Sequence, residues 1–508
     1  MINGGATTRG TRQFAEKHSA IAYNTLGRTR WQVSQAGFGC YRVSAGIDDH
    51  FQAMARSLTN GINLIDTSTN YSDGGSERLV GQVLEALISK AHIAREAIVI
   101  VSKVGYLQGQ NFALSQERKK QGEPFPDLVP YGQGLEHCIH PEFIEDQLSR
   151  TLERLGLETL DLLMLHNPEY YLGWAAKQGI SPDQARKKFY QRIRLAFQFL
   201  EKEVARGRIQ SYGISANTFP VSRHDEDFIS LEKVWRLALD VSPSHHFRAV
   251  QLPMNLFENG AVLEENQGDG KSVLSYARSK QLGVLINRPL NAFARNRLVR
   301  LADVEKISRY TDEDVIQAIG NLNKSEKVLW QKVLPALNLP TRLYQRIKDQ
   351  AGVGDQLKHH WRNFGRYERW RQFKDGLLWP HLQGVFDFLK SYAGQMDALD
   401  QWLLSHPRKL NAAVRAVGSL YVAGAAREID AIRRQVAAAD AAAAWDVEGS
   451  FSQQALRAVR STIGVSAVLV GMRHTRYVDD VLEELRRPVE IQDRTASWKR
   501  LRAALTNL

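Results

Sequence analysis

The sequence has very little cysteine and no long apolar run, and both absences narrow the class of protein. Only Cys40 and Cys138 occur among the 508 residues, so no disulfide framework is expected. No stretch of about 18 apolar residues exists, so no transmembrane helix is expected. Residues 1–20 contain no apolar segment of the kind that a secretory signal needs. We therefore expect a cytoplasmic protein with no membrane partner.

The sequence also lacks the signatures of zinc and phosphate-loop sites. His140, His245, His246 and His474 do not have the spacing of a motif such as HExxH, so no metal is predicted. The GKS within residues 268–272 lacks the preceding glycine of a P-loop, and we interpret this segment as a turn that begins a helix. No GxGxxG follows an early strand, so a Rossmann cofactor site is not expected.

Positive charge is in excess. Lysine and arginine number 67 and acidic residues 55, which gives a formal net charge of +12. A positive field attracts anions, so it suits a phosphorylated cofactor or nucleic acid, and a merely basic surface is an equally weighted alternative. The apolar content of 43% and charged content of 24% are typical of a globular protein.

Short apolar runs alternate with longer amphipathic stretches before about residue 290. Each run lacks strict alternation, as expected of parallel strands that are covered on both faces. Helical stretches such as 143–156 and 192–207 are long enough for right-handed crossovers between parallel strands. We predict strands at residues 35–40, 62–67, 97–103, 160–166, 210–215, 248–254 and 283–287.

The last predicted strand, residues 466–472, lies between helical stretches at 452–464 and 475–487. The pattern predicts an α/β fold, a (β/α)8 TIM barrel formed by residues 20–294 and 449–508.

Two insertions interrupt this predicted barrel. Residues 295–448 contain no convincing strand, and we interpret them as a helical subdomain between strand seven and helix seven. A smaller segment, residues 106–141, follows the third strand and is too irregular to be a barrel element. Both insertions leave the C-terminal ends of strands, which is the face where barrel enzymes carry their sites.

Four polar residues lie at or just after the ends of successive predicted strands. Asp66 closes the second strand, Tyr71 follows it, Lys103 closes the third, and His166 closes the fourth. Because the carboxyl ends of parallel strands converge at the barrel mouth, these side chains are expected to share a pocket. Taken singly, a buried Asp–Lys pair or a core histidine has a purely structural explanation. Their joint placement favours a catalytic role.

That chemistry is the protonation of a carbonyl oxygen as hydride arrives at the carbon. A nearby ammonium lowers the pKa of a tyrosine, and an aspartate would hold that ammonium in place. A histidine would orient and polarise the carbonyl.

Segments along the whole predicted barrel resemble the aldo-keto reductase family and occur in the family's order. They are residues 37–46, 61–84, 101–105, 152–169, 207–217, 250–258, 287–293 and 469–482. The resemblance implies an NADP(H)-dependent oxidoreductase that transfers a hydride between the cofactor and an aldehyde, ketone or sugar carbonyl or alcohol. It also implies that residues 25–34 form a hairpin that closes the bottom of the barrel.

The resemblance assigns roles to the four strand-end residues. Tyr71 is the general acid/base, Lys103 its activator, Asp66 the partner of that lysine, and His166 the residue that orients the carbonyl.

The resemblance also implies a set of cofactor-binding residues. Gly39, Cys40 and Tyr41 would lie against the nicotinamide ribose, and Ser215 and Gln251 would contact the nicotinamide amide. The remaining residues of the set are Asn287, Arg288, Leu290, Gly471 and Arg473.

Three positions depart from the family pattern. Ala216 replaces the usual asparagine, with Asn217 one place later, and Asn287 stands where many members stack an aromatic ring on the nicotinamide. The family asparagine that reads adenine is replaced near Asp480.

Three arginines are candidates for the phosphate contacts. Arg288 either approaches the pyrophosphate or is a surface arginine. Arg473, with Arg476, falls where the family binds the adenosine 2′-phosphate, and a guanidinium grips phosphate bidentately. The sequence therefore favours NADP over NAD.

An aromatic and basic segment, residues 358–374, allows several interpretations. Basic residues between aromatic ones are typical of single-stranded nucleic-acid binding. A period of three to four is instead typical of one buried helical face, packed on the barrel or on a partner subunit. A third alternative is a helix that roofs the active site. We favour the buried face, so no nucleic-acid partner is expected, and an oligomer stays open. The aromatic residues are Trp361, Phe364, Tyr367, Trp370 and Phe373.

A second functional hypothesis follows from the departures at Ala216 and Asn287. The barrel would then be a cofactor-binding sensor or scaffold whose helical insertion recruits a partner. The main hypothesis requires only a small-molecule carbonyl or alcohol substrate.

Overall fold

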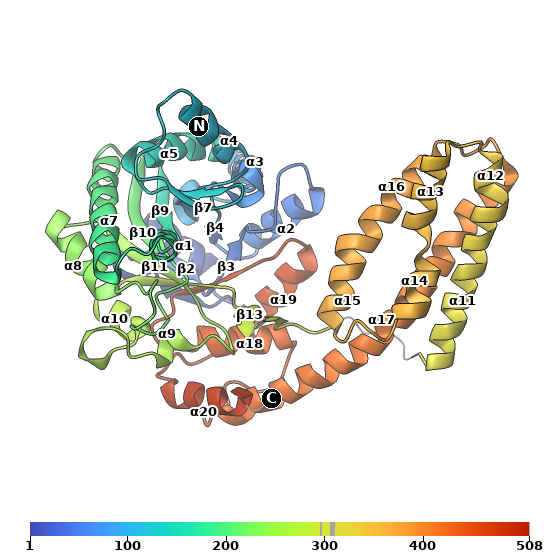
Figure 1. Ribbon diagram of the computed structural model, residues 1–508. Helices are drawn as coiled ribbons and strands as arrows, with labels where there is room; N and C mark the ends of the chain where they lie inside the picture. Colours follow the sequence, from blue (N-terminus) through green and yellow to red (C-terminus); the bar gives the residue numbers. More distant parts are fainter. Residues whose placement is uncertain (295–296, 305–309, 507–508) are drawn as a thin grey trace. The chain divides into compact units, whose positions relative to one another are not determined.

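The computed structural model describes residues 1–294, 297–304 and 310–506. The chain forms two compact units (Figure 1). The first comprises Met1–Ala302 together with Arg433–Leu508, and the second comprises Asp303–Ile432.

The first unit contains a closed barrel in the order β10-β11-β12-β15-β3-β4-β5-β9, in which all neighbouring strands pair in parallel. Every strand falls on a predicted one, so the predicted TIM barrel is confirmed. All residues of β9 are buried, because one face lines the barrel interior and the other meets the outer helices. The strands are β3 (Ala36–Gly39), β4 (Leu64–Asp66), β5 (Val99–Val104), β9 (Leu160–His166), β10 (Ile209–Ser215), β11 (Phe247–Pro253), β12 (Gly283–Asn287) and β15 (Ala467–Val470).

The helices of the first unit begin and end at residues suited to caps. For α5, Pro141 occupies the first turn, the His140 side chain accepts the Glu142 N–H, and Gly156 ends the helix at φ 67°. Ser272 caps α10, as expected for the turn at 268–272. The helices are α1 (Thr8–Lys17), α2 (Asp48–Thr59), α3 (Gly75–Ile88), α4 (Gly109–Lys120), α5 (Pro141–Leu155), α6 (Tyr170–Lys177), α7 (Pro182–Ala205), α8 (Leu231–Val241), α9 (Gly260–Leu263), α10 (Val273–Ser279), α18 (Phe451–Arg460), α19 (Thr475–Arg486) and α20 (Thr495–Thr506).

A hairpin closes the bottom of the barrel, as the resemblance implies. Strands β1 (Tyr23–Thr25) and β2 (Gln32–Ser34) pair antiparallel. Leu26, Trp31 and Val33 from this region are buried in one cluster with interior residues of the barrel strands. Helix α1 was not predicted, since it precedes residue 20, where the predicted barrel begins.

The segment that follows β5, residues 106–141, is not an element of the barrel, as expected, but it has regular structure that the sequence did not predict. It contains α4 and a three-stranded antiparallel sheet in the order β6-β8-β7. Its strands are β6 (Tyr106–Leu107), β7 (Val129–Gly132) and β8 (Leu135–His137). Strands this short leave no alternation in the sequence, and only pairing across a long loop defines them.

A second hairpin, β13 (Asn291–Ala294) with β14 (Arg297–Arg300), follows β12. The expectation of no strand after Ala294 was therefore wrong for β14. A long helical region then separates β14 from β15, as predicted.

The second unit is helical. Its helices are α11 (Asp312–Val328), α12 (Leu334–Ala336), α13 (Thr341–Ala351), α14 (Val353–His360), α15 (Tyr367–Phe373), α16 (Trp379–Lys390) and α17 (Asp397–Ala439), the last of which continues into the first unit. π-helical turns at Leu329–Val333 and Lys374–Leu378 join α11 to α12 and α15 to α16. None of the helices in the described ranges is long and apolar enough to cross a membrane.

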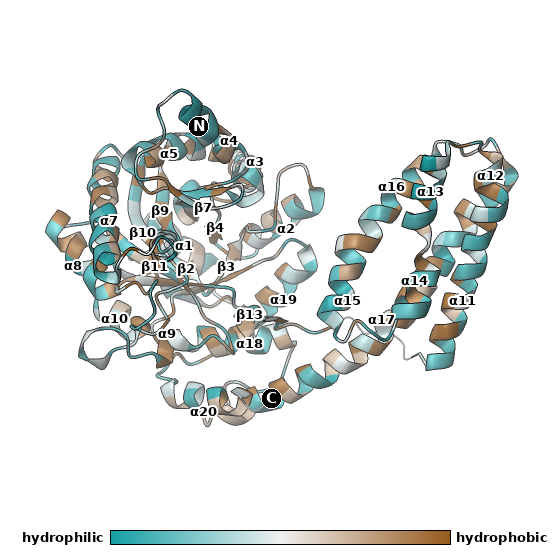
Figure 2. Cartoon of the chain, in the orientation of Figure 1, coloured by the Kyte–Doolittle hydropathy of each residue, from teal (hydrophilic) through white to brown (hydrophobic). Residues whose placement is uncertain are grey.

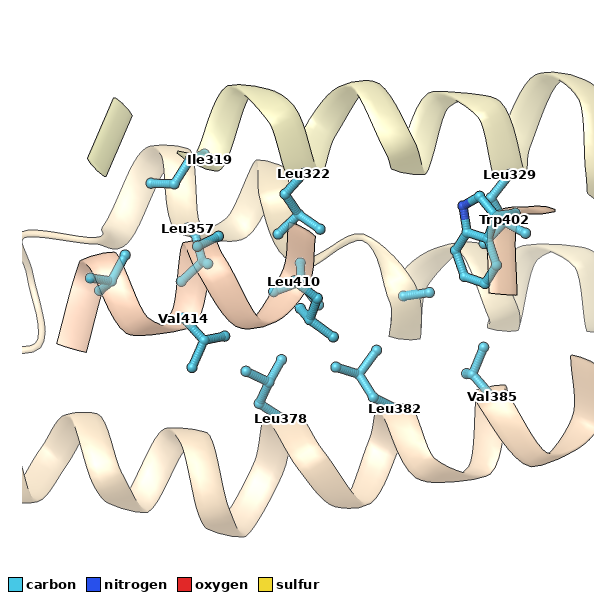
Figure 3. Close-up of a cluster of buried hydrophobic side chains, with 14 of the residues drawn as sticks. Ile319, Leu322, Leu329, Leu357, Leu378, Leu382, Val385, Trp402, Leu410 and Val414 are labelled. Carbon is cyan, nitrogen blue, oxygen red and sulfur yellow. The ribbon is translucent and has the colours of Figure 1, made fainter. Parts of the chain in front are cut away.

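The second unit has a hydrophobic core of its own. Apolar and polar residues alternate along its helices (Figure 2), and the apolar side chains of α11, α14, α16 and α17 point toward one another (Figure 3). The Trp402 indole N–H, inside this core, donates to the main-chain oxygen of Ser325 at 2.9 Å. This buried indole is thus satisfied within an apolar core.

The aromatic stripe of residues 358–374 packs into this core. Trp361 and Trp370 are buried, and Phe364 packs against the same cluster. A buried face is therefore confirmed, but it is buried within the helical unit itself, whereas the sequence was interpreted as packing it on the barrel or on a partner subunit. The segment is not one helix, because a turn with Gly365 at φ 71° separates α14 from α15.

Candidate active site

An ion pair and a phenol meet at the end of β4. Asp66 is the last residue of that strand, Lys103 lies on the neighbouring β5, and Tyr71 begins the short turn before α3. Lys103 Nζ donates to Asp66 Oδ2 at 2.7 Å and to the main-chain oxygen of Thr67 at 2.8 Å. It also lies 3.3 Å from the Tyr71 hydroxyl. All three donors of the ammonium are therefore used.

His166 joins these groups from the end of β9. Its ring centroid lies 6.0 Å from that of Tyr71, with the rings nearly perpendicular. Its Nδ1 lies 3.1 Å from Ser68 Oγ. The four residues that the sequence predicts at one barrel mouth are thus brought together.

Burial and charge set the protonation states of these groups. Burial lowers the pKa of Lys103, but Asp66 and Tyr71 outweigh it, so the pKa is raised and the side chain stays an ammonium. Burial and the Lys103 ammonium hold the pKa of His166 well below its ordinary value, so the imidazole is neutral.

The sequence predicts that Lys103 lowers the pKa of Tyr71, and the net effect is the opposite. Burial raises the pKa of the phenol to about 12, and the ammonium only offsets part of that rise. Without a ligand, Tyr71 is therefore a protonated acid at neutral pH.

A chain of hydrogen bonds runs from Asp66 across the mouth to β11, β10 and β12. Gln251 Nε2 donates to Asp66 Oδ1 at 2.8 Å. Ser215 Oγ donates to Gln251 Oε1 at 3.1 Å, and Asn287 Nδ2 lies 3.4 Å from the same oxygen. The Asn287 Oδ1 atom is buried and accepts no hydrogen bond from the described residues. An amide of a nicotinamide would fit this edge, because it would supply the missing donor.

Gly39, Cys40 and Tyr41 follow one another at the end of β3. A Cβ on Gly39 would lie 3.3 Å from the main chain of Val470, so glycine favours this close packing of β3 on β15. The Cys40 side chain is buried and its N–H donates to the main-chain oxygen of Asp66 at 2.9 Å. Tyr41 is 66% exposed and its ring contacts Tyr71 edge-on, with centroids 5.2 Å apart. Of the Cys40 and Tyr41 side chains, only that of Tyr41 is open to a ligand.

Arg288 and Leu290 follow β12 in the turn before β13. The Arg288 guanidinium pairs with Glu258 at 2.5 Å and lies over the Phe293 ring. Leu290 is half-buried, and its main-chain oxygen accepts the N–H of Leu301 at 2.9 Å. A role of Arg288 at a pyrophosphate stays a prediction, with Glu258 as its competitor.

Gly471 and Arg473 follow β15, and both are exposed. Arg476 is also exposed and lies over the ring of Tyr477. By contrast, the Asp480 carboxylate accepts hydrogen bonds from Ser450 and Ser452 at the start of α18. The two arginines are open to a phosphate, whereas Asp480, on α19, is held by serines at the start of α18.

Sequence reasoning missed the residues that surround His166. His137 Nε2 donates to the main-chain oxygen of His166 at 2.7 Å, and the Tyr106 ring lies edge-on to the imidazole at 4.7 Å. Both residues belong to the small sheet after β5, whose strands the sequence did not predict, so no pattern in the sequence connected them to the site.

Glu169 was also missed. It is 4% exposed, and burial raises its pKa to about 8 although the Asn217 N–H, at 2.8 Å, stabilises the carboxylate. The HNPE sequence, which begins at the last residue of β9, carries an acidic residue near the mouth, and this was the available signal.

In the described part of the chain, no three or more histidine, cysteine, aspartate or glutamate side chains are grouped as for a metal ion. His246 pairs with Glu201 and His474 with Asp49. His245 packs edge-on against Trp235.

Comparison with known proteins relates the chain to reductases. It is similar to an NADPH-dependent D-xylose reductase of Meyerozyma guilliermondii, with 23% identity over 335 residues that cover 63% of this chain and 86% of that protein. It is also similar to an NADH-specific methylglyoxal reductase of Escherichia coli (strain K12), with 29% identity over 149 residues. That match spans 28% of this chain and 40% of the length of the relative.

Among solved structures, a glycerol dehydrogenase from Gluconobacter oxydans is 16% identical, with coverage of 96% of this chain and 95% of that chain and a TM-score of 0.40. An aldo/keto reductase from Klebsiella pneumoniae in complex with NADP and acetate is 20% identical, covers 53% of this chain and 68% of its own, and has a TM-score of 0.33. The family model described as "Aldo/keto reductase family" matches residues 37–294. The chain belongs to the aldo/keto reductase family.

Proposed function

We propose that this protein is an NADP(H)-dependent oxidoreductase that transfers a hydride between the cofactor and an aldehyde, ketone or sugar carbonyl, or the corresponding alcohol. Membership of the family implies an oxidoreductase that acts on carbonyl compounds. The observation that carries the proposal is the position of the Lys103 ammonium, 2.7 Å from the Asp66 carboxylate and 3.3 Å from the Tyr71 hydroxyl.

In the proposed reduction, Tyr71 is the general acid. NADPH, when bound, supplies the hydride that reaches the carbonyl carbon. Tyr71 gives its phenolic proton to the carbonyl oxygen, and Lys103 stabilises the phenolate that remains. Asp66 keeps the ammonium aimed at the phenol, and His166 hydrogen-bonds the carbonyl oxygen and orients it. In the reverse direction the Tyr71 phenolate accepts the proton of the alcohol.

The proposed cofactor site uses two groups of residues. Ser215, Gln251 and Asn287 would hold the nicotinamide amide, and the unpartnered Asn287 oxygen supports this assignment. Asn287 would give the nicotinamide a polar contact in place of a stacked aromatic ring. Gly39, Cys40 and Tyr41 would lie beside the ribose. On the other side, Gly471 and Arg473 would receive the adenosine 2′-phosphate, with Arg288 and Leu290 near the pyrophosphate.

Two relatives differ in the cofactor that their names state. The D-xylose reductase is named as NADPH-dependent, which agrees with exposed arginines after β15. The methylglyoxal reductase is named as NADH-specific, but it matches over only 149 residues. A guanidinium that grips phosphate is the feature that favours NADP here.

The test is Tyr71→Phe. The variant is expected to lose carbonyl reduction by at least about 100-fold, because general acid catalysis is removed. NADPH binding, followed by quenching of protein fluorescence, is expected to stay within about twofold, since the phenol is not assigned to the cofactor. The matched control is Tyr23→Phe, which removes a hydroxyl that donates to the main-chain oxygen of Gly61 in the bottom region. It should retain turnover.

Two outcomes would contradict the proposal. Substantial turnover by Tyr71→Phe would show that another group is the acid. If the wild-type chain bound NADPH but oxidised none of it across a panel of aldehydes, ketones and sugars, the sensor or scaffold hypothesis would replace the enzyme.

A further inference from the structure

A row of hydrogen bonds that the family roles do not include ends on His166. Ser68 Oγ lies 3.1 Å from His166 Nδ1 and donates to Asn70 Oδ1 at 2.7 Å. Asn70 Nδ2 in turn donates to Gln108 Oε1 at 3.1 Å. Ser68 and Asn70 follow β4, whereas Gln108 precedes α4 in the segment after β5. Two loops of the barrel mouth thus converge on one imidazole.

The direction of this row decides where the imidazole proton lies. A serine hydroxyl has a single proton, and the nearer acceptor of Ser68 is Asn70 Oδ1 at 2.7 Å, whereas the main-chain oxygen of Lys103 lies at 3.3 Å. Ser68 Oγ then accepts from His166, so the proton of the neutral imidazole is on Nδ1 and Nε2 carries a lone pair.

The row can also run in the opposite direction with the same heavy-atom positions. A side-chain amide presents an acceptor and a donor on its two sides, so a half-turn of Gln108 and of Asn70 exchanges them. Asn70 then donates to Ser68, and Ser68 donates to His166 Nδ1. The proton lies on Nε2, and this tautomer can donate a hydrogen bond to a carbonyl oxygen.

We propose that Ser68, Asn70 and Gln108 are positioning residues that set which nitrogen of His166 carries the proton, and that the row reverses when a carbonyl binds. The proposal rests on the proposed function, because it is the carbonyl that requires a proton on Nε2. It identifies three residues of this chain that act on the reaction through His166 without contact with the substrate.

The surroundings of His166 fix its position and its charge, so the tautomer is the property of this residue that can change. His137 Nε2 fixes its main-chain oxygen at 2.7 Å, and the Tyr106 ring packs against the imidazole. His166 is 7% exposed, and its pKa is far below the ordinary value, so a change of charge does not substitute for a change of tautomer at neutral pH.

The test compares Asn70→Asp with Asn70→Ala at about pH 8. The introduced carboxylate has the shape of the asparagine amide but only accepts hydrogen bonds, so Ser68 must keep donating to it and His166 stays protonated on Nδ1. In Asn70→Ala the Ser68 hydroxyl is released and can donate to His166. A structural role predicts more damage from the larger truncation. The proposed role of the row predicts the opposite ranking of the two variants. The kcat/KM of Asn70→Asp should be lower than that of the wild type by on the order of 100-fold, and clearly below that of Asn70→Ala.

The second readout is spectroscopic and does not depend on turnover. Proton–nitrogen NMR of protein labelled in its histidine rings reports which imidazole nitrogen is protonated, and His166→Gln identifies the signal of His166. We expect the Nδ1–H form in the free wild-type protein and in Asn70→Asp. With NADPH and an unreactive carbonyl analogue, the wild type should change to Nε2–H while Asn70→Asp does not.

A matched control is Ser211→Ala, which removes a buried hydroxyl that donates to the main-chain oxygen of Asp161 elsewhere in the barrel. It should leave kcat/KM and the His166 tautomer unchanged, whereas Ser68→Ala should alter both. The proposed role of the row is overturned if Asn70→Asp is at least as active as Asn70→Ala. It is also overturned if His166 has the same tautomer in the wild type and in Asn70→Asp, both with and without the analogue. Retained turnover in Tyr71→Phe would instead end the proposed acid role, and the NMR result would still stand.

Discussion

The Tyr71 hydroxyl and the Lys103 ammonium lie 3.3 Å apart, and the ammonium also lies over the Tyr71 ring at 4.8 Å from its centroid. The lysine thus faces both the atom that would release a proton and the ring that would keep the negative charge. Because Lys103 is fully buried, this interaction is weakly screened by water.

Lys103→Met should abolish turnover and destabilise the protein. The Asp66 carboxylate would remain buried without its cation, which typically costs about 3–5 kcal/mol. The free energy of unfolding of the barrel, measured in urea, should fall by that order. In the double variant Asp66→Asn with Lys103→Met, stability should recover in part because no buried charge is left, but turnover should not return. A single variant as stable as wild type would contradict the role of this ion pair.

The two directions of the reaction should depend differently on pH. Burial raises the pKa of Tyr71 to about 12, so the neutral phenol that reduction needs is present below that value and the phenolate that oxidation needs is scarce. Initial rates of alcohol oxidation should rise about tenfold per pH unit between about pH 7 and 10, while carbonyl reduction stays nearly flat. Because His166 is neutral, no acidic limb is expected near pH 6.5. A bell-shaped reduction profile centred near that pH would argue against this assignment.

Arg473→Ala should weaken NADPH binding and spare NADH. The guanidinium is assigned to the 2′-phosphate, which only NADPH carries, so the dissociation constant of NADPH should rise at least about tenfold, or about 1.4 kcal/mol. The control Arg194→Ala removes a partly exposed arginine that pairs with Asp240 on α8. It should change neither constant. Equal losses for both cofactors would remove the basis for NADP preference.

Trp370→Ala should destabilise the helical unit. Trp370 is 2% exposed and stacks on Tyr421, so its truncation should cost about 3–5 kcal/mol. Hydrogen exchange of amides in α15 and α16 would measure the loss locally, which is preferable for a chain with two compact units. Leu404→Ala, at a side chain that is 76% exposed, is the control and should change stability by less than about 0.5 kcal/mol. Similar protection in both variants would contradict the assigned core.

The barrel could be predicted because its strands are local features. A parallel strand buried on both faces is a short apolar run, and residues such as Asp66 and His166 stand out at the end of such runs. The second hairpin and the small sheet β6-β8-β7 could not be predicted, because their strands are two residues long or mix apolar residues with polar residues, proline or glycine. The equally short barrel strand β15 is instead wholly apolar and buried.

The sequence alone therefore determined the positions of the barrel strands, the strand-end residues Asp66, Lys103 and His166 with Tyr71 close behind, and the helical character of the long insertion. Only the tertiary structure decided the hydrogen bond from Gln251 to Asp66, which joins residues 185 positions apart, and the row from Gln108 to His166. It also decided that burial outweighs Lys103 in setting the pKa of Tyr71. The physical reason is that apolar patterning and residue type act locally along the chain, whereas desolvation and hydrogen-bond direction depend on every group that folding brings within a few ångströms.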